Sequence, residues 1–179
     1  MRILGVDPGS IITGYGVVDT CGGWVRRVDS GAIAMRAGEP FADRLAAIYR
    51  LLIDVIDRSH PDVFCIETAF YGKNVQSTLK LGQVRGVAIL AAAHRGLTVH
   101  EYSPREVKQA VTGNGAAAKH QIAYMVKKVL GLRAGFHRTD EADGLAVAIC
   151  HAWRSGAHAS GRPVTWAEFT AAHPERIRK

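Results

Sequence analysis

Arg2-Ile3-Leu4-Gly5-Val6-Asp7-Pro8-Gly9-Ser10 is the stretch on which the rest of the fold depends. Ile3 to Val6 form a short apolar run that ends in the carboxylate of Asp7 and is followed at once by Pro8-Gly9. Strand-forming residues bounded by proline and glycine predict a buried strand that runs into a tight turn. An acid at the end of such a strand is costly to bury unless a cation lies beside it. Asp7 could instead cap the turn with its own side chain, so its meaning depends on the other acids of the chain.

The composition indicates one compact domain. The chain has 179 residues, of which 47% are hydrophobic, and this is enough for a sizeable core. No apolar run approaches the roughly 20 residues that span a bilayer. The chain begins directly with the first strand and shows no signal-peptide pattern, so we expect a cytoplasmic protein. Cys65 and Cys150 lie in apolar stretches and are interpreted as reduced core residues.

The net charge of +7 is concentrated in one part of the chain. Residues 104–138 contain seven lysines and arginines and one acid, which is a surplus of six positive charges. A concentrated basic surface is typical of a protein that binds a polyanion, most often nucleic acid. A merely solvated helix face could explain Lys127 and Lys128, but it explains the whole window less well.

The order of predicted elements indicates an α/β fold. Three strands joined by short turns come first, and helices then alternate with two further strands. We expect a mixed five-stranded sheet with helices on both faces. The expected strands are 3–7, 13–19, 24–34, 63–67 and 98–102, and the expected helices are 40–58, 75–93, one that begins at 104, 116–130, and 140–153 with Thr139 as its N-cap. Residues 1–154 would form the domain, and residues 155–179 would form a flexible C-terminal tail.

Glycines and one capping motif give local detail. Gly14 and Gly16 weaken the second strand and indicate either a close approach by backbone or ligand, or a bulge. Gly82 and Gly86 are four residues apart on one side of a predicted helix, where the sheet or a second copy of the chain could come close. Ser103-Pro104-Arg105-Glu106 predicts a capping box with proline at the first helical position.

Four acids stand out by their surroundings. Asp7 and Glu67 each end an apolar strand, and their carboxylates would lie side by side if the two strands are neighbours. Asp140 and Asp143 are three residues apart at the start of the last predicted helix and therefore share a face. Interaction with the helix dipole alone would explain Asp140. It explains Asp143 less well, because the apolar run that follows indicates a largely buried helix.

Carboxylates gathered in one cleft repel each other, and raised pKa values or bound divalent cations are the ordinary solutions. A site built entirely from oxygen ligands suits Mg²⁺ or Mn²⁺ rather than zinc. Two such ions about 4 Å apart are the usual means of hydrolysing a phosphodiester by in-line displacement. Beside a strongly basic window, such a site predicts a nuclease.

Several motifs in collinear order over residues 1–153 carry a resemblance to a known family. Together they resemble the RuvC family of Holliday-junction resolvases. They are Gly5-Val6-Asp7-Pro8-Gly9, Ile66-Glu67 with Phe70 and Lys73-Asn74, Leu79-Lys80-Leu81-Gly82-Gln83, Pro104-Arg105-Glu106-Val107-Lys108, Gly113-Asn114-Gly115 with Lys119, and Asp140-Glu141-Ala142-Asp143 through His151.

The resemblance implies a ribonuclease H-like fold, a homodimer, Mg²⁺-dependent paired nicking of four-way DNA junctions, and work alongside the RuvA–RuvB branch-migration complex. It implies that Asp7, Glu67, Asp140 and Asp143 hold the metal, with Mn²⁺ as a substitute and two ions per site when DNA is bound. Lys119 would join these acids in catalysis. The residues expected to contact DNA are Phe70, Tyr71, Lys73, Asn74, Lys80, Arg85, Arg105, Lys108, Asn114 and Lys119.

Phe70 matches the aromatic residue that stacks on opened bases at the crossover. It could also be a core aromatic, but aromatics interleaved with basic residues suit base stacking. Lys119 could be a solvated helix residue, but its place directly after the Gly113-Asn114-Gly115 segment favours a phosphate contact.

Two other functions compete with this reading. An actin-like ATPase also begins with a strand, an acid and a glycine-rich turn, but it needs two duplicated domains, for which this chain is too short. A junction-binding protein without activity is the second alternative, and the complete set of four acids disfavours it.

Overall fold

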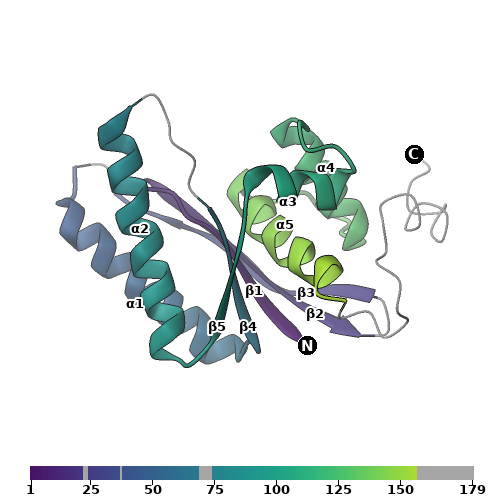
Figure 1. The fold of residues 1–179 in the computed structure, drawn as a ribbon, viewed down its shortest axis with the longest axis horizontal. Helices are drawn as coiled ribbons and strands as arrows, with labels where there is room; N and C mark the ends of the chain where they lie inside the picture. Colours follow the sequence, from purple (N-terminus) through teal and green to yellow (C-terminus); the bar gives the residue numbers. More distant parts are fainter. Residues whose placement is uncertain (22–23, 37, 69–73, 157–179) are drawn as a thin grey trace.

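A computed structural model describes residues 1–21, 24–36, 38–68 and 74–156 (Figure 1). Within these ranges the backbone forms five strands and five helices in the order that the sequence predicts. The strands are β1 (Arg2–Asp7), β2 (Ile12–Cys21), β3 (Trp24–Ala34), β4 (Val63–Glu67) and β5 (Thr98–Tyr102). The helices are α1 (Phe41–Ser59), α2 (Val75–His94), α3 (Pro104–Thr112), α4 (Lys119–Val129) and α5 (Thr139–Arg154).

The strands form one mixed sheet in the order β3-β2-β1-β4-β5. β2 pairs antiparallel with both β1 and β3, as the two short connections predict. β4 pairs parallel with β1, and β5 pairs parallel with β4. β1 and β4 are therefore central neighbours that run in the same direction, so their carboxyl ends meet at one edge of the sheet. The predicted mixed five-stranded α/β architecture is confirmed.

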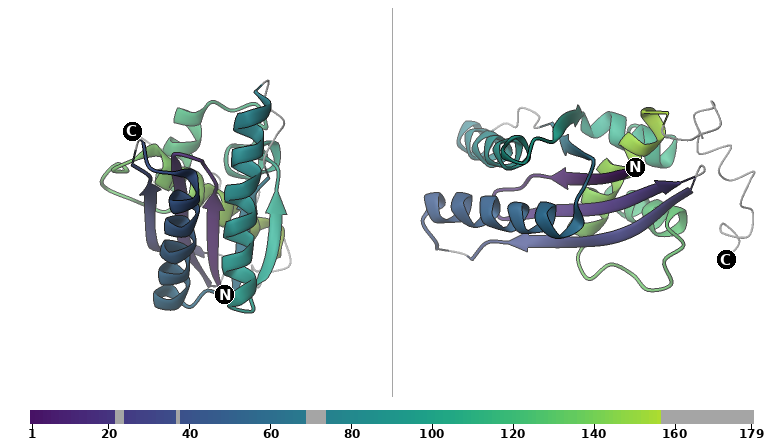
Figure 2. Two further views of the ribbon diagram at one scale, coloured as in Figure 1. Left: turned by 90° about the vertical axis from the view of Figure 1, so that its left-hand side faces the viewer. Right: turned by 90° about the horizontal axis from the view of Figure 1, so that it is seen from below.

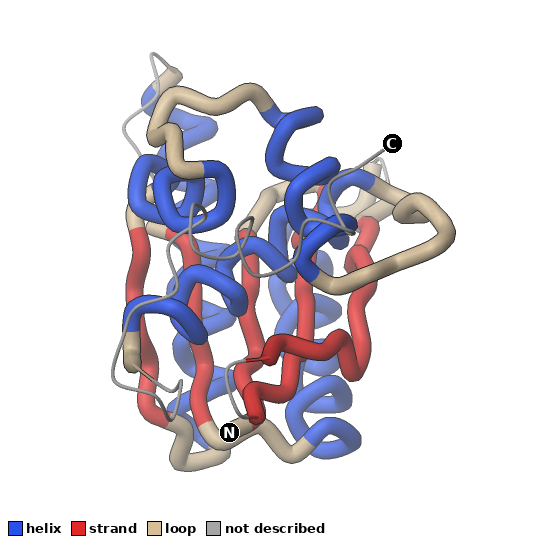
Figure 3. The backbone as a smooth tube through the Cα atoms, turned by 90° about the vertical axis from the view of Figure 1, so that its right-hand side faces the viewer, coloured by secondary structure: helices blue, strands red, loops and turns tan. Residues whose placement is uncertain are grey.

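Helices cover both faces of this sheet. Figure 1 shows α1 and α2 on one side of the strands and α3, α4 and α5 on the other. The left-hand view of Figure 2 looks onto the first pair, and Figure 3 looks onto the second group. Leu4 and Val6 of β1 belong to the core beneath α1 and α2, whereas Ile3 belongs to the core beneath α5. Because β1 is buried on both faces, the carboxylate at its end has little access to bulk water.

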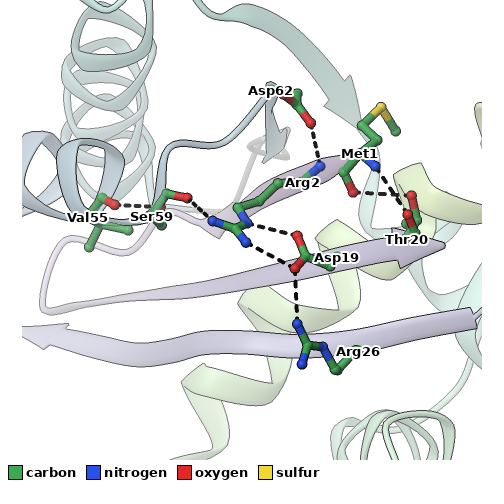
Figure 4. Close-up of polar contacts among 8 residues, drawn as sticks. All are labelled: Met1, Arg2, Asp19, Thr20, Arg26, Val55, Ser59 and Asp62. Atoms are coloured by element: carbon green, nitrogen blue, oxygen red, sulfur yellow. Dashed lines mark hydrogen bonds and ion pairs between the residues drawn. The ribbon is translucent and has the colours of Figure 1, made fainter.

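A polar network fixes the amino-terminal end of β1 (Figure 4). The Arg2 guanidinium donates to both carboxylate oxygens of Asp19 on β2, at 2.8 and 3.1 Å, and to the carbonyl of Ser59 at the end of α1, at 2.7 Å. The Arg2 backbone N–H donates to the Asp62 carboxylate at 2.6 Å, just before β4 begins. One residue thus ties β1 to β2, to α1 and to the entry of β4, and this supports the register that places Asp7 at the far end.

Two predicted helix boundaries were wrong. α4 begins at Lys119 rather than at residue 116, because Asn114 holds the preceding segment in a turn: its side-chain oxygen accepts from the Ala116 N–H at 2.9 Å. Thr139 is not the N-cap of α5 but its first residue; Arg138 takes the cap position without a side-chain hydrogen bond. The Ser103–Glu106 capping box is present as predicted.

Cys65 and Cys150 are buried free thiols, as expected. None of the helices in the described ranges has both the length and the apolar character needed to cross a membrane. The predicted C-terminal tail, residues 155–179, lies almost entirely outside the described residues.

Candidate active site

A cavity of about 230 Å³ opens at the carboxyl ends of β1 and β4. Its polar lining comes from five different elements of the fold, whereas its apolar wall comes from α3, α4 and α5. The polar residues are Asp7 (β1), Glu67 (β4), Lys108 (α3), Lys119 (α4) and Asp143 (α5). Three of the four predicted acids therefore share this cavity with two of the predicted lysines.

The parallel pairing of β1 and β4 brings Asp7 and Glu67 together. Val6 is paired with Ile66, so the residue that follows each of them leaves the sheet at the same edge. Glu67 is in turn paired with Tyr102 of β5, and the Thr68 N–H donates to the Tyr102 carbonyl at 2.8 Å. The sheet itself therefore fixes the position of Glu67.

Glycines bring α5 unusually close to the sheet. A Cβ on Gly14 would collide with the carbonyl of Asp140, and one on Gly16 would lie 2.6 Å from Cα of Leu145. From the helix side, a Cβ on Gly144 would lie 2.5 Å from Cα of Tyr15. The close approach predicted from Gly14 and Gly16 is confirmed, and the approaching group is the backbone of α5. This contact brings the first turns of α5, with Asp140 and Asp143, to the end of β1.

Lys119 is the cation that contacts these acids. Its Nζ lies 2.7 Å from Oδ2 of Asp143 and 3.5 Å from Oδ1 of Asp140. The Asp143 side chain is 14% exposed and that of Lys119 is 55% exposed, so a largely buried carboxylate is paired with an ammonium that solvent still reaches. Asp140 does not line the cavity itself, but Lys119 connects it to the group.

The electrostatics of the cavity are unbalanced. Burial raises the pKa of Asp7 from 3.8 to about 7, and Asp143 and Asp140 add to this rise while Lys119 opposes it. Burial likewise raises the pKa of Glu67 from 4.5 to about 8; Asp7 and Asp143 contribute, and Lys108 and Lys119 oppose. The pKa of Asp143 is also raised, mainly by burial and against the effect of Lys119. Two lysines therefore do not neutralise the clustered carboxylates, and further positive charge would be bound favourably.

The donor chemistry fits a hard divalent cation such as Mg²⁺, because every acidic ligand is a carboxylate oxygen. In the described parts of the chain, no three carboxylate, imidazole or thiol side chains are grouped tightly enough to hold an ion as they lie. The Lys119 ammonium occupies the space between Asp140 and Asp143. Two of the four ligands that would hold the ion are therefore paired with a lysine in this structure.

The predicted DNA contacts are distributed over several elements. Phe70, Tyr71 and Lys73 lie outside the described residues. Asn74 caps α2, where its side-chain oxygen accepts from the Ser77 N–H at 3.1 Å. The Nζ of Lys80 lies 5.9 Å from the centre of the Phe41 ring.

Arg85 and Asn114, two further residues predicted to contact DNA, also have partners within the chain. Arg85 pairs with Glu101 of β5 at 2.5 Å, and its buried Nε has no partner among the described groups. A DNA contact by Arg85 would have to compete with this pair. Asn114 builds the turn before α4 through its own backbone and side chain.

The basic window is largely free to bind an anion. Among the described residues, its ion pairs are those of Lys119 with the acids of α5 and of Glu106 with Arg154. Six cations of the window form no ion pair within the described ranges: Arg105, Lys108, Lys127, Lys128, Arg133 and Arg138. Unpaired cations in the window that also supplies Lys108 and Lys119 to the cavity suit a nucleic-acid backbone.

Sequence reasoning missed the apolar wall of the cavity, which consists of Pro104, Val107, Ile122 and Ala146. Helical spacing could have revealed part of it, because Ile122 lies three residues after Lys119 and Ala146 lies three residues after Asp143. These side chains exclude water from one side of the carboxylates, which is consistent with the raised pKa values.

Three features define the class of this protein. They are the strand order of the sheet, the acids at the ends of two parallel central strands, and an acid-bearing helix packed across the sheet. Together they define a nuclease with a ribonuclease H-like fold.

Comparison with known proteins narrows the class to one family. Residues 3–151 match the family described as crossover junction endodeoxyribonuclease RuvC, and the chain belongs to this family. It is 46% identical over 178 residues to the crossover junction endodeoxyribonuclease RuvC of Salinibacter ruber, covering 99% of each chain. It is 50% identical over 152 residues to that of Pelotomaculum thermopropionicum, covering 85% of this chain and 93% of the relative.

A solved structure agrees with this assignment. Thermus thermophilus RuvC in complex with Holliday junction substrate matches with a TM-score of 0.81 at 32% identity, covering 90% of this chain and 97% of that one. The fold class and the family inferred from the sequence are confirmed.

Proposed function

We propose that this chain is a metal-dependent endonuclease that resolves four-way DNA junctions by paired, symmetric nicking. The observation that carries the proposal is the convergence of Asp7, Glu67 and Asp143 with Lys119 on one cavity. Family membership and the junction-bound relative support the choice of substrate.

In this proposal Asp7, Glu67, Asp140 and Asp143 hold Mg²⁺, for which Mn²⁺ can substitute, with two ions when DNA is bound. When bound, such ions supply an activated water and stabilisation of the leaving oxygen. The protein contributes the placement of the four acids and the exclusion of water by the apolar wall. Lys119 acts as the nearest fixed cation and stabilises the charge that develops on the scissile phosphate. Lys108 of α3, which also lines the cavity, orients that phosphate.

The basic window binds the phosphate backbone of the junction arms, since phosphate contacts position a protein on DNA without reading its sequence. We propose that Phe70 stacks on bases at the opened crossover and that Tyr71 and Lys73 contact the DNA. These roles rest on the family resemblance and on their place in the chain immediately after Glu67.

A homodimer would present two such sites to two strands. The exposed side of α2 is the surface that we propose for the dimer interface. Val75, Leu79 and Leu90 are 71%, 64% and 48% exposed there, an unusual amount of apolar surface for one helix. Gly82 and Gly86 lie among them, and a Cβ on either would meet nothing within 4 Å among the described residues. A second copy of the chain could therefore approach α2 closely. Leu79→Asp should produce monomers in sedimentation analysis if this surface is the interface.

Work alongside the RuvA–RuvB complex and a cytoplasmic location remain expectations from the family resemblance and the sequence. The experiment that tests the proposed function compares a synthetic four-way junction with a linear duplex of the same sequence, each with Mg²⁺ and with EDTA. The proposal expects paired nicks in the junction with Mg²⁺ alone. Binding to the junction without nicks under any condition would favour the inactive junction-binding protein instead.

A further inference from the structure

Tyr102 and His151 are joined by a hydrogen bond at the point where β5 leads into α3. The Tyr102 hydroxyl lies 2.7 Å from Nδ1 of His151, and the two rings are 5.9 Å apart in a T-shaped arrangement. His151 lies on α5 and is only 4% exposed. A buried polar pair of this kind needs an explanation, because an apolar pair would fill the same space without requiring matched partners.

We propose that Tyr102 and His151 are positioning residues for the active site. Their hydrogen bond would hold the end of β5 against α5. It would thereby fix the two walls of the carboxylate cavity that adjoin Tyr102. The inference rests on the proposed function, because it concerns the placement of the residues assigned there.

The first wall contains Glu67. Tyr102 is the β5 partner of Glu67 in the parallel register, and its carbonyl accepts the hydrogen bond from the Thr68 N–H at 2.8 Å. β5 is an edge strand, so β4 is its sole neighbour within the described sheet. A displacement of Tyr102 would therefore move the backbone that carries Glu67.

The second wall is α3, which begins two residues after Tyr102 and contributes Pro104, Val107 and Lys108 to the cavity. Its first turn is anchored through Arg154 at the end of α5. The Arg154 guanidinium lies 5.8 Å from the centre of the Tyr102 ring and 3.1 Å from Oε1 of Glu106. The other oxygen of Glu106 accepts from the backbone N–H and the hydroxyl of Ser103, both at 2.8 Å. A continuous chain of contacts thus connects His151 with the start of α3.

α5 connects the acids of the cavity with the Tyr102–His151 bond. Its first turns carry Asp140 and Asp143, and its last turns carry His151 and Arg154. The helix thereby acts as a rigid reference: one end places two acids, and the other end, through Tyr102, places Glu67 and Lys108 opposite them. Displacement by about 1 Å in such a constellation can cost about 100-fold in rate.

The test uses Tyr102→Phe, which removes the hydroxyl and keeps the ring beside Arg154. We expect single-turnover cleavage at saturating junction to fall about 10-fold, while the affinity for the junction in EDTA changes by less than about twofold. Tyr49→Phe is a matched control, because the Tyr49 hydroxyl also lies 2.7 Å from Nδ1 of a histidine, His94, on the opposite face of the sheet. It should cleave at the wild-type rate.

A pair of His151 variants separates positioning from packing. His151→Asn keeps a polar atom at the place of Nδ1 and should restore most of the rate, whereas His151→Leu should not. If Tyr102→Phe fails to fold, this comparison decides the question alone. In addition, the double variant Tyr102→Phe/Lys108→Met should lose less rate than the product of the two separate losses. The reason is that Tyr102 acts partly by positioning Lys108.

A lower melting temperature for Tyr102→Phe with an unchanged cleavage rate would overturn the proposal and leave the bond a purely stabilising one. Equal rates for His151→Asn and His151→Leu would do the same. These outcomes differ from a failure of the proposed active site, which would show as retained cleavage by Glu67→Gln.

Discussion

The Nζ of Lys119 lies 2.7 Å from Oδ2 of Asp143, so a lysine at the start of one helix pairs with an acid in the first turns of another. The pair lies inside the cavity that Asp7 and Glu67 also line. Lys119 therefore affects this site in two ways. It partly compensates the clustered carboxylates, and it places a fixed positive charge where a scissile phosphate would be bound.

Replacing this lysine should affect chemistry more than binding. We expect Lys119→Met to slow single-turnover cleavage by about 100-fold, because removal of one preorganised charge that stabilises a transition state has effects of this size. Junction affinity should change less than about threefold, since the basic window offers other cations to the phosphate backbone. Rapid-quench kinetics at saturating junction measures the first effect, and fluorescence anisotropy measures the second.

Lys127→Met serves as the contrasting variant on the same helix. Lys127 belongs to the basic window and forms no ion pair among the described residues, so we assign it to binding of the DNA backbone. It should weaken binding and leave the saturated rate unchanged. If Lys119→Met shows that same pattern, Lys119 is an anchor for the backbone and not part of the chemistry.

Cleavage should increase with pH across the neutral range. The pKa of Asp7 is raised to about 7 and that of Glu67 to about 8 in the metal-free protein, so both carboxyls bind protons that must leave before they can act as ligands. Metal binding and protonation compete, and more Mg²⁺ should move the midpoint of the pH–rate profile to lower pH. Single-turnover rates from pH 5.5 to 9 at two Mg²⁺ concentrations check this. A profile that is flat through pH 6 to 8 at low Mg²⁺ would contradict the assignment of these acids as ligands.

His151 should make the fold sensitive to acid. Burial, with a contribution from His100, lowers the pKa of His151 from 6.5 to about 4. The folded-state pKa lies below the unfolded one, so the associated stability is complete above pH 6.5 and is lost as pH falls toward 4. The full loss is about 3 kcal/mol. Urea unfolding at pH 7 and pH 4.5 should show a smaller loss for His151→Asn than for the wild type, whereas equal losses would mean that other groups cause the acid sensitivity.

The contact between α5 and the sheet should not tolerate a methyl group. We expect Gly144→Ala to lower the free energy of unfolding by at least about 2 kcal/mol, because its Cβ would lie 2.5 Å from Cα of Tyr15 on a backbone that cannot move aside easily. Gly135→Ala is the control, since a Cβ there meets nothing within 4 Å in the part of the chain that the structure describes, and it should be neutral or slightly stabilising. Chemical denaturation of both variants measures the difference. Similar stabilities would show that the helix can shift without cost.

The sequence predicted most of this fold because its signals are local. The apolar runs that end in Asp7 and Glu67 indicate buried strands, and the capping box at Ser103 marks the start of α3 to the residue. The boundary of α4 was missed because a turn organised by Asn114 is compatible with the same alanine-rich segment that favours a helix.

The site was predicted only as a set of residues. Nothing in the spacing of residues 119 and 143 shows that Lys119 bridges the two acids of α5, because the contact depends on how α4 and α5 pack. The same applies to the Tyr102–His151 bond, whose members are 49 positions apart and come from a strand and a helix. Gly14 and Gly16 did indicate a close approach, but the partner, the backbone of α5, became visible only in the structure.

The most direct test of the central claim is the Asp7→Asn variant on a four-way junction. The substitution removes the negative charge of one proposed metal ligand and keeps the size of the side chain. We predict that Asp7→Asn binds the junction in EDTA within about threefold of the wild-type affinity, because the proposed phosphate contacts come from the basic window, and that it produces no nicks with Mg²⁺. Nicking near the wild-type rate, or loss of folding and binding together, would contradict the account, since Asp7 would then be dispensable or purely structural.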